Sequence, residues 1–366
     1  MNNELLYQLA LTQVPNIGSI HAKILLQAYG NAKSIFQAPR HHLERIEGIG
    51  TVRADAIRSF NAWDSCDKEI NFAQKKKIKV LFQDDEDYPK RLLHCPDSPI
   101  LIFYKGNVSL NASRIVSVVG TRNHSEYGRH ACEEFIEKIK DEQVLIISGL
   151  AFGIDTISHK AALKNELPTV GVLAHGLDRI YPPENRNLAK QMLENGGLVT
   201  EFWSENDPDR ENFPMRNRIV AGMCDVVVVI ESGKKGGSMI TADIANSYNK
   251  DVFALPGRTS DPKSEGCNLL IRNNKAMLLT DAIHFLEMMN WRQTKVPKKK
   301  QRELFITLTE NEQLIVDILK DRPSIHIDEL YLRCNLSGTQ TAAALLMLEL
   351  NGIIISLPGK IYQLNL

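Results

Sequence analysis

Three glycine-containing turns in the middle of the chain could bind phosphate groups. Each follows an apolar run and precedes a segment with helical spacing, in the sequences VVGTR, SGLAFGID and KKGGS. Backbone amides at the start of a helix point toward an anion, and a guanidinium adds a charged hydrogen-bond donor. Glycine is also favoured in such turns for steric reasons alone, but the arginine and serine among them favour an anion cradle. The candidate phosphate-binding residues are Gly120, Thr121, Arg122, Ser148, Gly149, Gly237 and Ser238.

A fourth segment, RENFPMRNR, combines cations with an aromatic ring. Basic side chains hold a nucleic-acid backbone and an exposed ring stacks on an unpaired base, so this composition suits single-stranded nucleic acid. Alternatively, the ring packs against the helix start and one arginine pairs with a carboxylate. Helix N-termini disfavour cations unless an anion lies between them, which favours the binding role. The candidate residues are Arg210, Phe213, Arg216, Asn217 and Arg218, with Arg186 as a further cation.

Composition and motifs exclude several other classes of protein. The 366 residues carry 44 Lys+Arg against 44 Asp+Glu, so any nucleic-acid binding depends on local clusters rather than on a global field. Neither GxGxxG nor GxxxxGKS/T occurs, so we expect no nucleotide cofactor. The six cysteines form no CxxC pair, which indicates buried reduced thiols and no metal site. Short apolar runs and the lack of a signal sequence predict a cytoplasmic protein without membrane contact.

The elements that must position these residues follow from the hydrophobic spacing. Seven Val/Ile-rich runs alternate with helix-length segments between Ser113 and about Asn290, which predicts buried parallel strands joined by helices. Val80 to Gly106 adds an edge strand and an antiparallel strand. The carboxyl ends of parallel strands meet at one edge of a sheet, so the turns described above should lie together. The seven runs are IVSVVG, VLIISG, TVGVLAHG, GLVTEF, DVVVVIES, DVFALPG and AMLLTD.

Different patterns flank this α/β region, which we expect to be an open, Rossmann-like parallel sheet over residues 71–291. Two turns, VPNIGS and IEGIGT, each open a helix and predict a helix-hairpin-helix or SAM-like domain over residues 1–70. Their glycines could hold DNA phosphates, or the helices could simply pack as a small bundle. A basic linker is expected over residues 292–303. Residues 304–366 show three helical segments and a hairpin around Pro358 and Gly359, which predicts a winged helix.

The expected recognition helix of that last domain, Ser337 to Leu350, contains Glu349 and no Lys or Arg. A groove-reading helix without cations lacks the electrostatic contribution that dominates DNA affinity. We therefore expect this domain to pack on protein, or to assist DNA binding weakly through Lys360 and the basic linker.

In their order along the chain, these motifs resemble the DprA/Smf family, the DNA-processing protein of bacterial natural transformation. The resemblance covers Val80 to about Leu279, and relatives also have a helical N-terminus and a winged-helix C-terminus. Several long motifs in one order are far more specific than any single motif. They are VVGTR, SGLAFGIDTISHKAAL, GLDRIYPPEN, GLVTEF, FPMRNRIVAG, KKGGSMITA, FALPG and NLLIRN.

The resemblance implies a non-enzymatic, cytoplasmic homodimer that binds incoming single-stranded DNA, shields it from nucleases and loads the RecA recombinase onto it. In that family the binding pocket uses an arginine and a basic residue near a phenylalanine, which match Arg122, Arg210 and Phe213 here. The chain departs from the family in two places, since GGS replaces the commoner SGS and Phe152 stands where relatives often have a basic residue. The second change weakens the charge of the pocket or supplies a ring that stacks on a base. The glycine-serine turns correspond to Ser148, Gly149, Gly237 and Ser238.

The competing hypothesis is an enzyme, a phosphoribohydrolase of the lysine decarboxylase-like, cytokinin-activating type that acts on nucleotide monophosphates. That family carries PGGxGTxxE with a catalytic glutamate. This chain has KGGSMITAD, with Met239 and Ile240 in place of Gly-Thr and Asp243 in place of the glutamate. The histidines of the α/β region occur singly, which is typical of structural residues. Asp155 is expected to cap a helix or to pair with an arginine, so we assign no catalytic residue.

Overall fold

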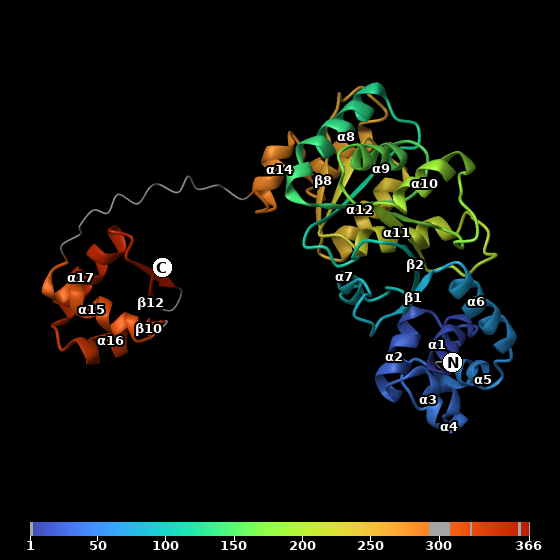
Figure 1. Cartoon of the computed structure of the whole chain (residues 1–366), viewed down its shortest axis with the longest axis horizontal. Coiled ribbons are helices and arrows are strands. Elements are labelled where there is room, and N and C mark those ends of the chain that lie inside the picture. Colours follow the sequence, from blue (N-terminus) through green and yellow to red (C-terminus); the bar gives the residue numbers. More distant parts are fainter. Residues whose placement is uncertain (1–2, 293–307, 323, 358–359, 366) are drawn as a thin grey trace. The chain divides into compact units, whose positions relative to one another are not determined.

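The computed structural model describes residues 3–292, 308–322, 324–357 and 360–365 (Figure 1). The chain divides into two compact units, Met1–Arg292 and Gln293–Leu366. The predicted basic linker at 292–303 falls, apart from Arg292, outside the described residues, as do Pro358 and Gly359 of the predicted hairpin. Every helix in the described ranges is too short or too polar to cross a bilayer.

The first unit begins with a bundle of helices, and the two predicted hairpin turns connect helices of this bundle. Arg53 joins these turns, because its Nε donates to the carbonyl of Asn16 at 2.9 Å and its Nη1 to the carbonyl of Gly48 at 3.0 Å. Leu25, Ile35 and other fully buried side chains give the helices an apolar core, which continues onto the first strands of the sheet. The bundle is thus a packed structural element, and DNA contact by its turns stays a prediction. The helices are α1 (Asn3–Gln13), α2 (Ser19–Tyr29), α3 (Ala32–Gln37), α4 (Arg40–Leu43), α5 (Gly50–Arg58) and α6 (Trp63–Lys75).

The rest of this unit contains a nine-stranded sheet in the order β1-β2-β6-β5-β4-β3-β7-β8-β9. The seven strands predicted from the apolar runs, β3 to β9, are parallel, while β1 pairs antiparallel with β2 and β2 with β6. The predicted α/β class is therefore confirmed. The strands are β1 (Lys79–Phe82), β2 (Leu101–Gly106), β3 (Ile115–Gly120), β4 (Leu145–Ser148), β5 (Thr169–Val172), β6 (Gly196–Thr200), β7 (Val226–Ile230), β8 (Asp251–Ala254) and β9 (Met277–Leu278).

The strand order reverses between β3 and β7. From β3 the chain continues through β4 and β5 to β6 on one side, and it returns to β7 on the other side of β3. The connections that leave the carboxyl ends of these two neighbouring strands diverge, so a crevice opens between them, and ligands of open α/β sheets bind at such a point. The turns after β3 and β7 are therefore placed to face a ligand.

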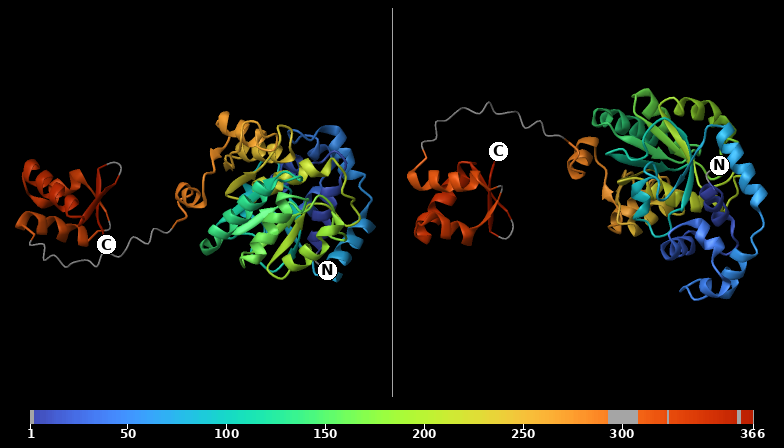
Figure 2. Two further views of the ribbon diagram at one scale, coloured as in Figure 1. Left: turned by 90° about the horizontal axis from the view of Figure 1, so that it is seen from above. Right: turned by 60° about the horizontal axis from the view of Figure 1, so that its bottom comes forward.

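Helices cover both faces of the sheet (Figure 2). Along β3, Val116 and Val118 pack toward α8, α9 and α14, whereas Ile115 and Val119 pack toward the face that α7, α11, α12 and α13 cover. Burial on both faces is what the continuous apolar runs predict. The six cysteines are buried and free, as predicted. The helices are α7 (Lys90–Leu93), α8 (Glu126–Lys138), η1 (Lys140–Glu142), α9 (Ile154–Lys164), η2 (Pro183–Asn185), α10 (Arg186–Met192), α11 (Asn212–Gly222), α12 (Gly237–Ser247), α13 (Glu265–Arg272) and α14 (Ala282–Met288).

The second unit contains the three helices and the paired strands of the predicted winged helix, which is thereby confirmed. Its first and third helices each begin with a capping box. In each box the side chain of the N-cap residue accepts a hydrogen bond from the backbone N–H three residues later, and the side chain of that later residue accepts one from the backbone N–H of the N-cap residue. The third helix, α17, is the expected recognition helix. The elements are α15 (Glu310–Lys320), β10 (Ile325–His326), α16 (Ile327–Cys334), α17 (Gly338–Leu350), β11 (Ile354–Leu357) and β12 (Ile361–Leu364), with β12 between the other two strands.

Candidate nucleic-acid interface

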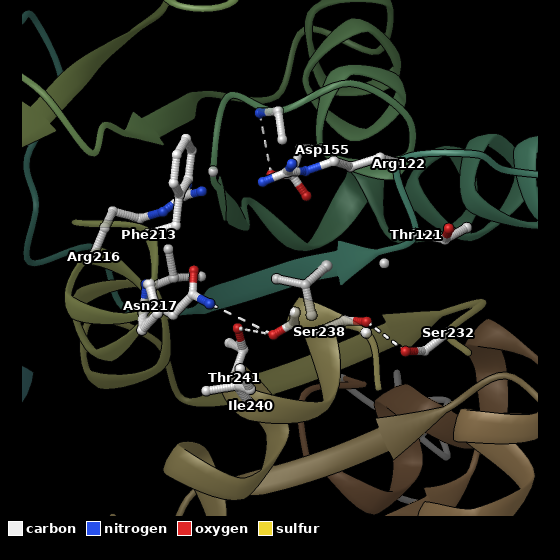
Figure 3. A pocket seen from close by; sticks show the side chains of 18 of the residues that line it. Thr121, Arg122, Asp155, Phe213, Arg216, Asn217, Ser232, Ser238, Ile240 and Thr241 are labelled. Atoms are coloured by element: carbon white, nitrogen blue, oxygen red, sulfur yellow. Dashed lines mark hydrogen bonds between the residues drawn. The ribbon is translucent and has the colours of Figure 1, made fainter. Parts of the chain in front are cut away.

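A cavity of about 800 Å³ opens at the carboxyl edge of the sheet, where the strand order reverses (Figure 3). Arg122 and Asp155 lie across it from Ser232 and Ser238. The turns after β3, β4 and β7 and the start of α11 all contribute to its wall, so segments far apart in sequence meet at one site. The predicted residues that line it are Gly120, Thr121, Arg122, Gly149, Arg210, Phe213, Arg216, Asn217, Gly237 and Ser238.

Two glycines fix the position of the turn that carries Arg122. A Cβ on Gly120 would lie 2.0 Å from the carbonyl oxygen of Ile230, and a Cβ on Gly153 would lie 2.2 Å from that of Thr121. Gly153 also has a φ of +80°, in the left-handed region that other residues rarely adopt. The turns after β3 and β4 therefore pack backbone against backbone, which sets the direction in which Arg122 leaves the sheet.

Arg122 lies over an aromatic ring. Its guanidinium carbon is 5.1 Å from the centroid of the Phe213 ring, which is within the range of a cation–π contact. The ring of Tyr181 meets Phe213 edge-on, with 6.3 Å between the centroids. Arg210, three residues before Phe213, is exposed at the rim of the same cavity. The cavity therefore brings together two cations and two aromatic rings, from Arg122, Arg210, Phe213 and Tyr181.

The floor of the cavity holds a buried pair of opposite charges. Arg216 is 5% exposed and donates from Nη1 to the carbonyl of Val172 at 2.8 Å, while its Nε has no hydrogen-bond partner among the described residues. Its guanidinium and the carboxylate of Asp155 both lie against Gly149, where a Cβ would come within 1.8 Å and 2.4 Å of them. Burial lowers the pKa of Arg216 and raises the pKa of Asp155, and each charge offsets part of the other's shift. The accessible positive charge of the cavity therefore comes from the exposed side chains of Arg122, Arg210 and Lys235.

The opposite wall is the start of α12. Gly237 opens this helix and Gly236 precedes it, and both line the cavity with Lys235. Ser238 donates from Oγ to Ser232 Oγ at 2.7 Å, which holds the helix start against the end of β7. Unpaired amides at the start of a helix favour an anion, so this wall supplies backbone donors in addition to the charge of the exposed Lys235. Ser232 was missed by sequence reasoning, although it follows β7 as Ser148 ends β4.

Three predicted residues lie outside the lining of the cavity. Ser148 is buried and donates to the carbonyl of Val118 at 2.6 Å, so it ties β4 to β3. Arg218 forms an ion pair with Glu201 and donates to the carbonyl of Asp97. It is two residues from Arg216 on α11, which places it about 200° around the helix and on the far side from the cavity. Arg186 is exposed at the first position of α10.

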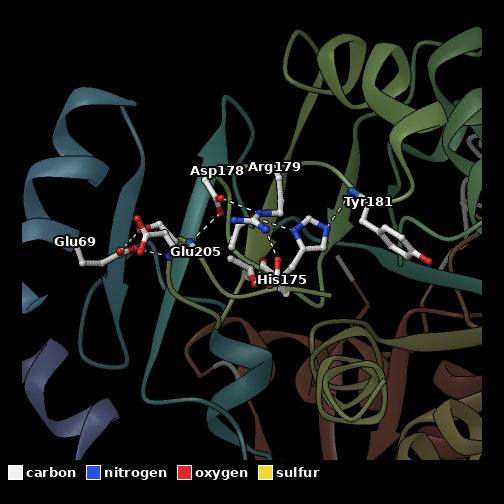
Figure 4. A network of polar contacts seen from close by, with 10 residues as sticks. Glu69, His175, Asp178, Arg179, Tyr181 and Glu205 are labelled. Atoms are coloured by element: carbon white, nitrogen blue, oxygen red, sulfur yellow. Dashed lines mark hydrogen bonds and ion pairs between the residues drawn. The ribbon is translucent and has the colours of Figure 1, made fainter. Parts of the chain in front are cut away.

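Tyr181 is positioned by a polar network that reaches the N-terminal helices (Figure 4). Its backbone N–H donates to Nε2 of His175 at 3.2 Å, and Nδ1 of His175 lies 2.8 Å from the carbonyl oxygen of Gly176. Asp178 accepts from the backbone of Glu205, and the neighbouring Ser204 donates to the buried carboxylate of Glu69 on α6. The loop that carries the Tyr181 ring is therefore braced from two sides. Sequence reasoning did not anticipate the contact between Tyr181 and Phe213.

The residues that the competing enzyme hypothesis could use, Asp243 and His159, lie outside the lining of the cavity. Asp243, which aligns with the catalytic glutamate of the phosphoribohydrolases, lies outside the cavity lining and pairs with Lys275 at 2.7 Å, with about half of each side chain exposed. His159 is fully buried, with Nε2 2.6 Å from the carbonyl oxygen of Gly149. Within the described ranges, no group of three or more His, Cys, Asp or Glu side chains could hold a metal ion.

Comparison with known proteins identifies two matching regions. Residues 79–290 match the family model described as DNA recombination-mediator protein A, and residues 301–360 match the DprA winged helix domain. Protein Smf of Escherichia coli K12 is 35% identical over 347 residues, which cover 90% of this chain and 89% of the relative.

Two solved structures share the fold. The crystal structure of DNA processing protein A from Streptococcus pneumoniae is 32% identical, with a TM-score of 0.66 and coverage of 78% of this chain and 98% of that one. The structure that describes the single-stranded DNA binding mode of DNA processing protein A from Helicobacter pylori is 27% identical, with a TM-score of 0.54. The match covers 58% of this chain and 96% of that one.

Proposed function

Because the chain belongs to the DNA recombination-mediator protein A family, we propose that the cavity at the carboxyl edge of its sheet binds single-stranded DNA without sequence preference. In this proposal Arg122 and Arg210 hold phosphates, Phe213 stacks on an unpaired base, and the start of α12 donates amides to the backbone. The solved structure of the relative from H. pylori is reported for its mode of binding single-stranded DNA, which supports single-stranded DNA as the ligand of this chain.

The observation that carries the proposal is the contact between Arg122 and Phe213 inside one cavity that also contains Arg210. A cation and a ring at the same mouth match the alternation of phosphate and base along a single strand. Stacking contributes roughly 1–3 kcal/mol per base, and every base has a face to stack. A duplex hides those faces, so binding to a duplex would first require unstacking.

We extend the proposal to the cellular role. The protein would act in natural transformation and recombination as a cytoplasmic homodimer that protects incoming single-stranded DNA and loads RecA onto it. Family membership supports this role. Protection is measured as the survival of a labelled single strand under a single-strand exonuclease, and loading as RecA-dependent strand exchange on DNA covered by single-strand-binding protein. Equal degradation and equal exchange with and without the protein would contradict the extension.

We also propose that the chain has no catalytic activity, since Asp243 and His159 both lie outside the cavity lining. The measurement is release of ribose 5-phosphate from nucleoside monophosphates at high protein concentration. Release above the no-protein control that Asp243→Asn abolishes would establish the enzyme instead.

The central test is fluorescence anisotropy with a labelled single strand and a duplex of the same sequence over a salt series. We expect tight binding of the single strand, weak binding of the duplex, and a log–log slope of about −0.7 for each phosphate neutralised. Equal affinity for both forms, or binding that is independent of salt, would overturn the proposed function.

A further inference from the structure

A second, smaller hollow adjoins the main cavity. It measures about 40 Å³ against about 800 Å³, and it shares Arg122, Tyr181, Phe213 and Arg216 with its larger neighbour. Phe152 lines only the smaller hollow. The hollow is too small to enclose a nucleobase, so a base at this place would lie across its aromatic rim.

Two aromatic side chains of this rim are open to solvent. Phe152 and Tyr181 are each 46% exposed, whereas Phe135, Phe253 and Phe285 in the core between the sheet and α8, α9 and α14 are buried. An exposed ring leaves apolar surface in contact with water, and covering that surface with an apolar partner is favourable. Both rings are therefore ready to accept a flat apolar partner.

The turn that carries Phe152 does not need its ring for folding. Thr156 donates from Oγ1 to the carbonyl of Ala151 at 2.7 Å, and the backbone N–H of Ala151 donates to Asp155 at 3.3 Å. Gly153 supplies the left-handed backbone conformation of the turn. Among the described residues, Phe152 belongs to none of the apolar clusters. The turn is held by the side chains of Thr156 and Asp155 and by the conformation of Gly153, while the Phe152 ring stays about half exposed.

Arg122 links the two hollows. It lines both, and its guanidinium makes no hydrogen bond to any described residue, so its five donors are available to a ligand. A phosphate that joins two nucleotides could bind these donors while the two bases rest on different rings. Phe213 would then take one base and Phe152, with Tyr181 beside it, the other.

We propose that Phe152, with Tyr181, forms a second base-stacking position, occupied by the nucleotide adjacent to the one on Phe213. This inference rests on the proposed function, because it needs single-stranded DNA in the main cavity. At this position the chain stacks a base instead of using a basic side chain to hold a phosphate. The contribution of Phe152 to affinity is therefore independent of salt.

The test compares two strands of equal length, an oligothymidylate and the same backbone with every base removed. For Phe152→Ala we expect the affinity for oligothymidylate to fall about tenfold, within the range for loss of one stacked base, while the affinity for the abasic strand stays unchanged. The log–log salt slope should equal that of the unsubstituted protein. Phe152→Trp should restore the affinity, and Phe152→Arg should steepen the slope by about 0.7.

Tyr127→Ala is the matched control, because Tyr127 is 52% exposed on α8 and lies outside both hollows. It should bind both strands normally. If Phe152→Ala binds oligothymidylate as tightly as the unsubstituted protein does, or loses the abasic strand equally, the second stacking position is wrong. The proposed function fails on different results. It is wrong if the unsubstituted protein does not bind single strands more tightly than duplexes, or if Arg122→Ala does not reduce the affinity for single strands.

Discussion

Arg122 and Phe213 are 91 positions apart in the sequence, yet the guanidinium carbon of one lies 5.1 Å from the ring centroid of the other. The contact joins the turn after β3 to the start of α11 across the point where the strand order reverses. A cation–π contact of this kind contributes about 0.5–1 kcal/mol. It restricts the Arg122 side chain in advance, so less conformational freedom is lost when a ligand binds. The pair is thus oriented before DNA arrives.

Arg122→Ala should weaken single-strand binding by more than tenfold, because it removes a phosphate contact and uncovers Phe213. Arg122→Lys should recover part of this loss, since lysine restores the charge but not the planar contact with the ring. The double variant Arg122→Ala with Phe213→Ala should lose retention of the oligonucleotide in a gel shift. Its urea unfolding curve should remain cooperative. Normal gel shifts from the double variant would exclude this pair as the binding site.

Arg210→Ala should change how binding depends on salt. Removing one phosphate-binding cation lowers the magnitude of the log–log slope by about 0.7. Lys164→Ala is the control, because Lys164 is exposed at the end of α9, beside Leu167 and Pro168 at the opposite edge of the sheet. That variant should keep both slope and affinity. Equal slopes for all three proteins, measured by anisotropy, would show that Arg210 does not bind a phosphate.

Two glycines, Gly153 behind the turn that carries Arg122 and Gly237 in the cavity wall, should respond differently to substitution by alanine. A Cβ on Gly153 would press on the backbone of Thr121 in a left-handed conformation, so Gly153→Ala should cost at least about 2 kcal/mol of unfolding free energy and weaken DNA binding. A Cβ on Gly237 has no atom within 4 Å, so Gly237→Ala should leave stability within about 1 kcal/mol. Urea unfolding of both variants measures the difference. Similar losses would contradict the backbone contact between the two turns.

The stability of the first unit should depend on pH through His159. Burial lowers its pKa to about 4 from 6.5, so the folded state keeps the imidazole neutral while the unfolded chain takes up a proton. The stability from the neutral ring is present above pH 6.5 and is lost as the pH falls to about 4, by at most about 3 kcal/mol. Below that pH the loss levels off.

The measurement is urea unfolding followed by tryptophan fluorescence, since Trp63, Trp203 and Trp291 all lie in the first unit. His159→Gln should be less stable than the unsubstituted protein at neutral pH. The difference between the two proteins should shrink between pH 6.5 and pH 4. A difference that stays constant over this range would show that His159 is not held neutral.

Removal of residues 293–366 should reduce single-strand affinity by less than about tenfold. Helix α17 carries no Lys or Arg, and it exposes Leu346, Met347 and Leu350. Such a surface cannot neutralise phosphates. Anisotropy on the truncated chain, with the salt slope as a second readout, measures the contribution of this unit. A larger loss, or a slope reduced by several phosphates, would assign DNA contacts to the winged helix or to the segment before it.

Local patterns in the sequence were sufficient to predict the fold. Continuous apolar runs such as Val226–Ile230 identify buried parallel strands, because only a strand covered on both faces is apolar at every position. The same rule places the turns after β3, β4 and β7 at one edge, since parallel strands share their carboxyl ends. Gly120, Arg122, Gly149 and Gly237 could therefore be assigned to one neighbourhood without coordinates.

Which side chains face the cavity was decided only by the tertiary structure. Arg216 and Arg218 are equivalent in the sequence RNR, but the packing of α11 turns one toward the cavity floor and the other toward Glu201. Ser148 ends a strand whose orientation points its hydroxyl to β3, and Tyr181 reaches Phe213 from a loop braced by His175. Spacing along the chain determines the type and order of the elements. The rotation of each helix and the path of each loop depend on contacts between distant segments, which no local pattern records.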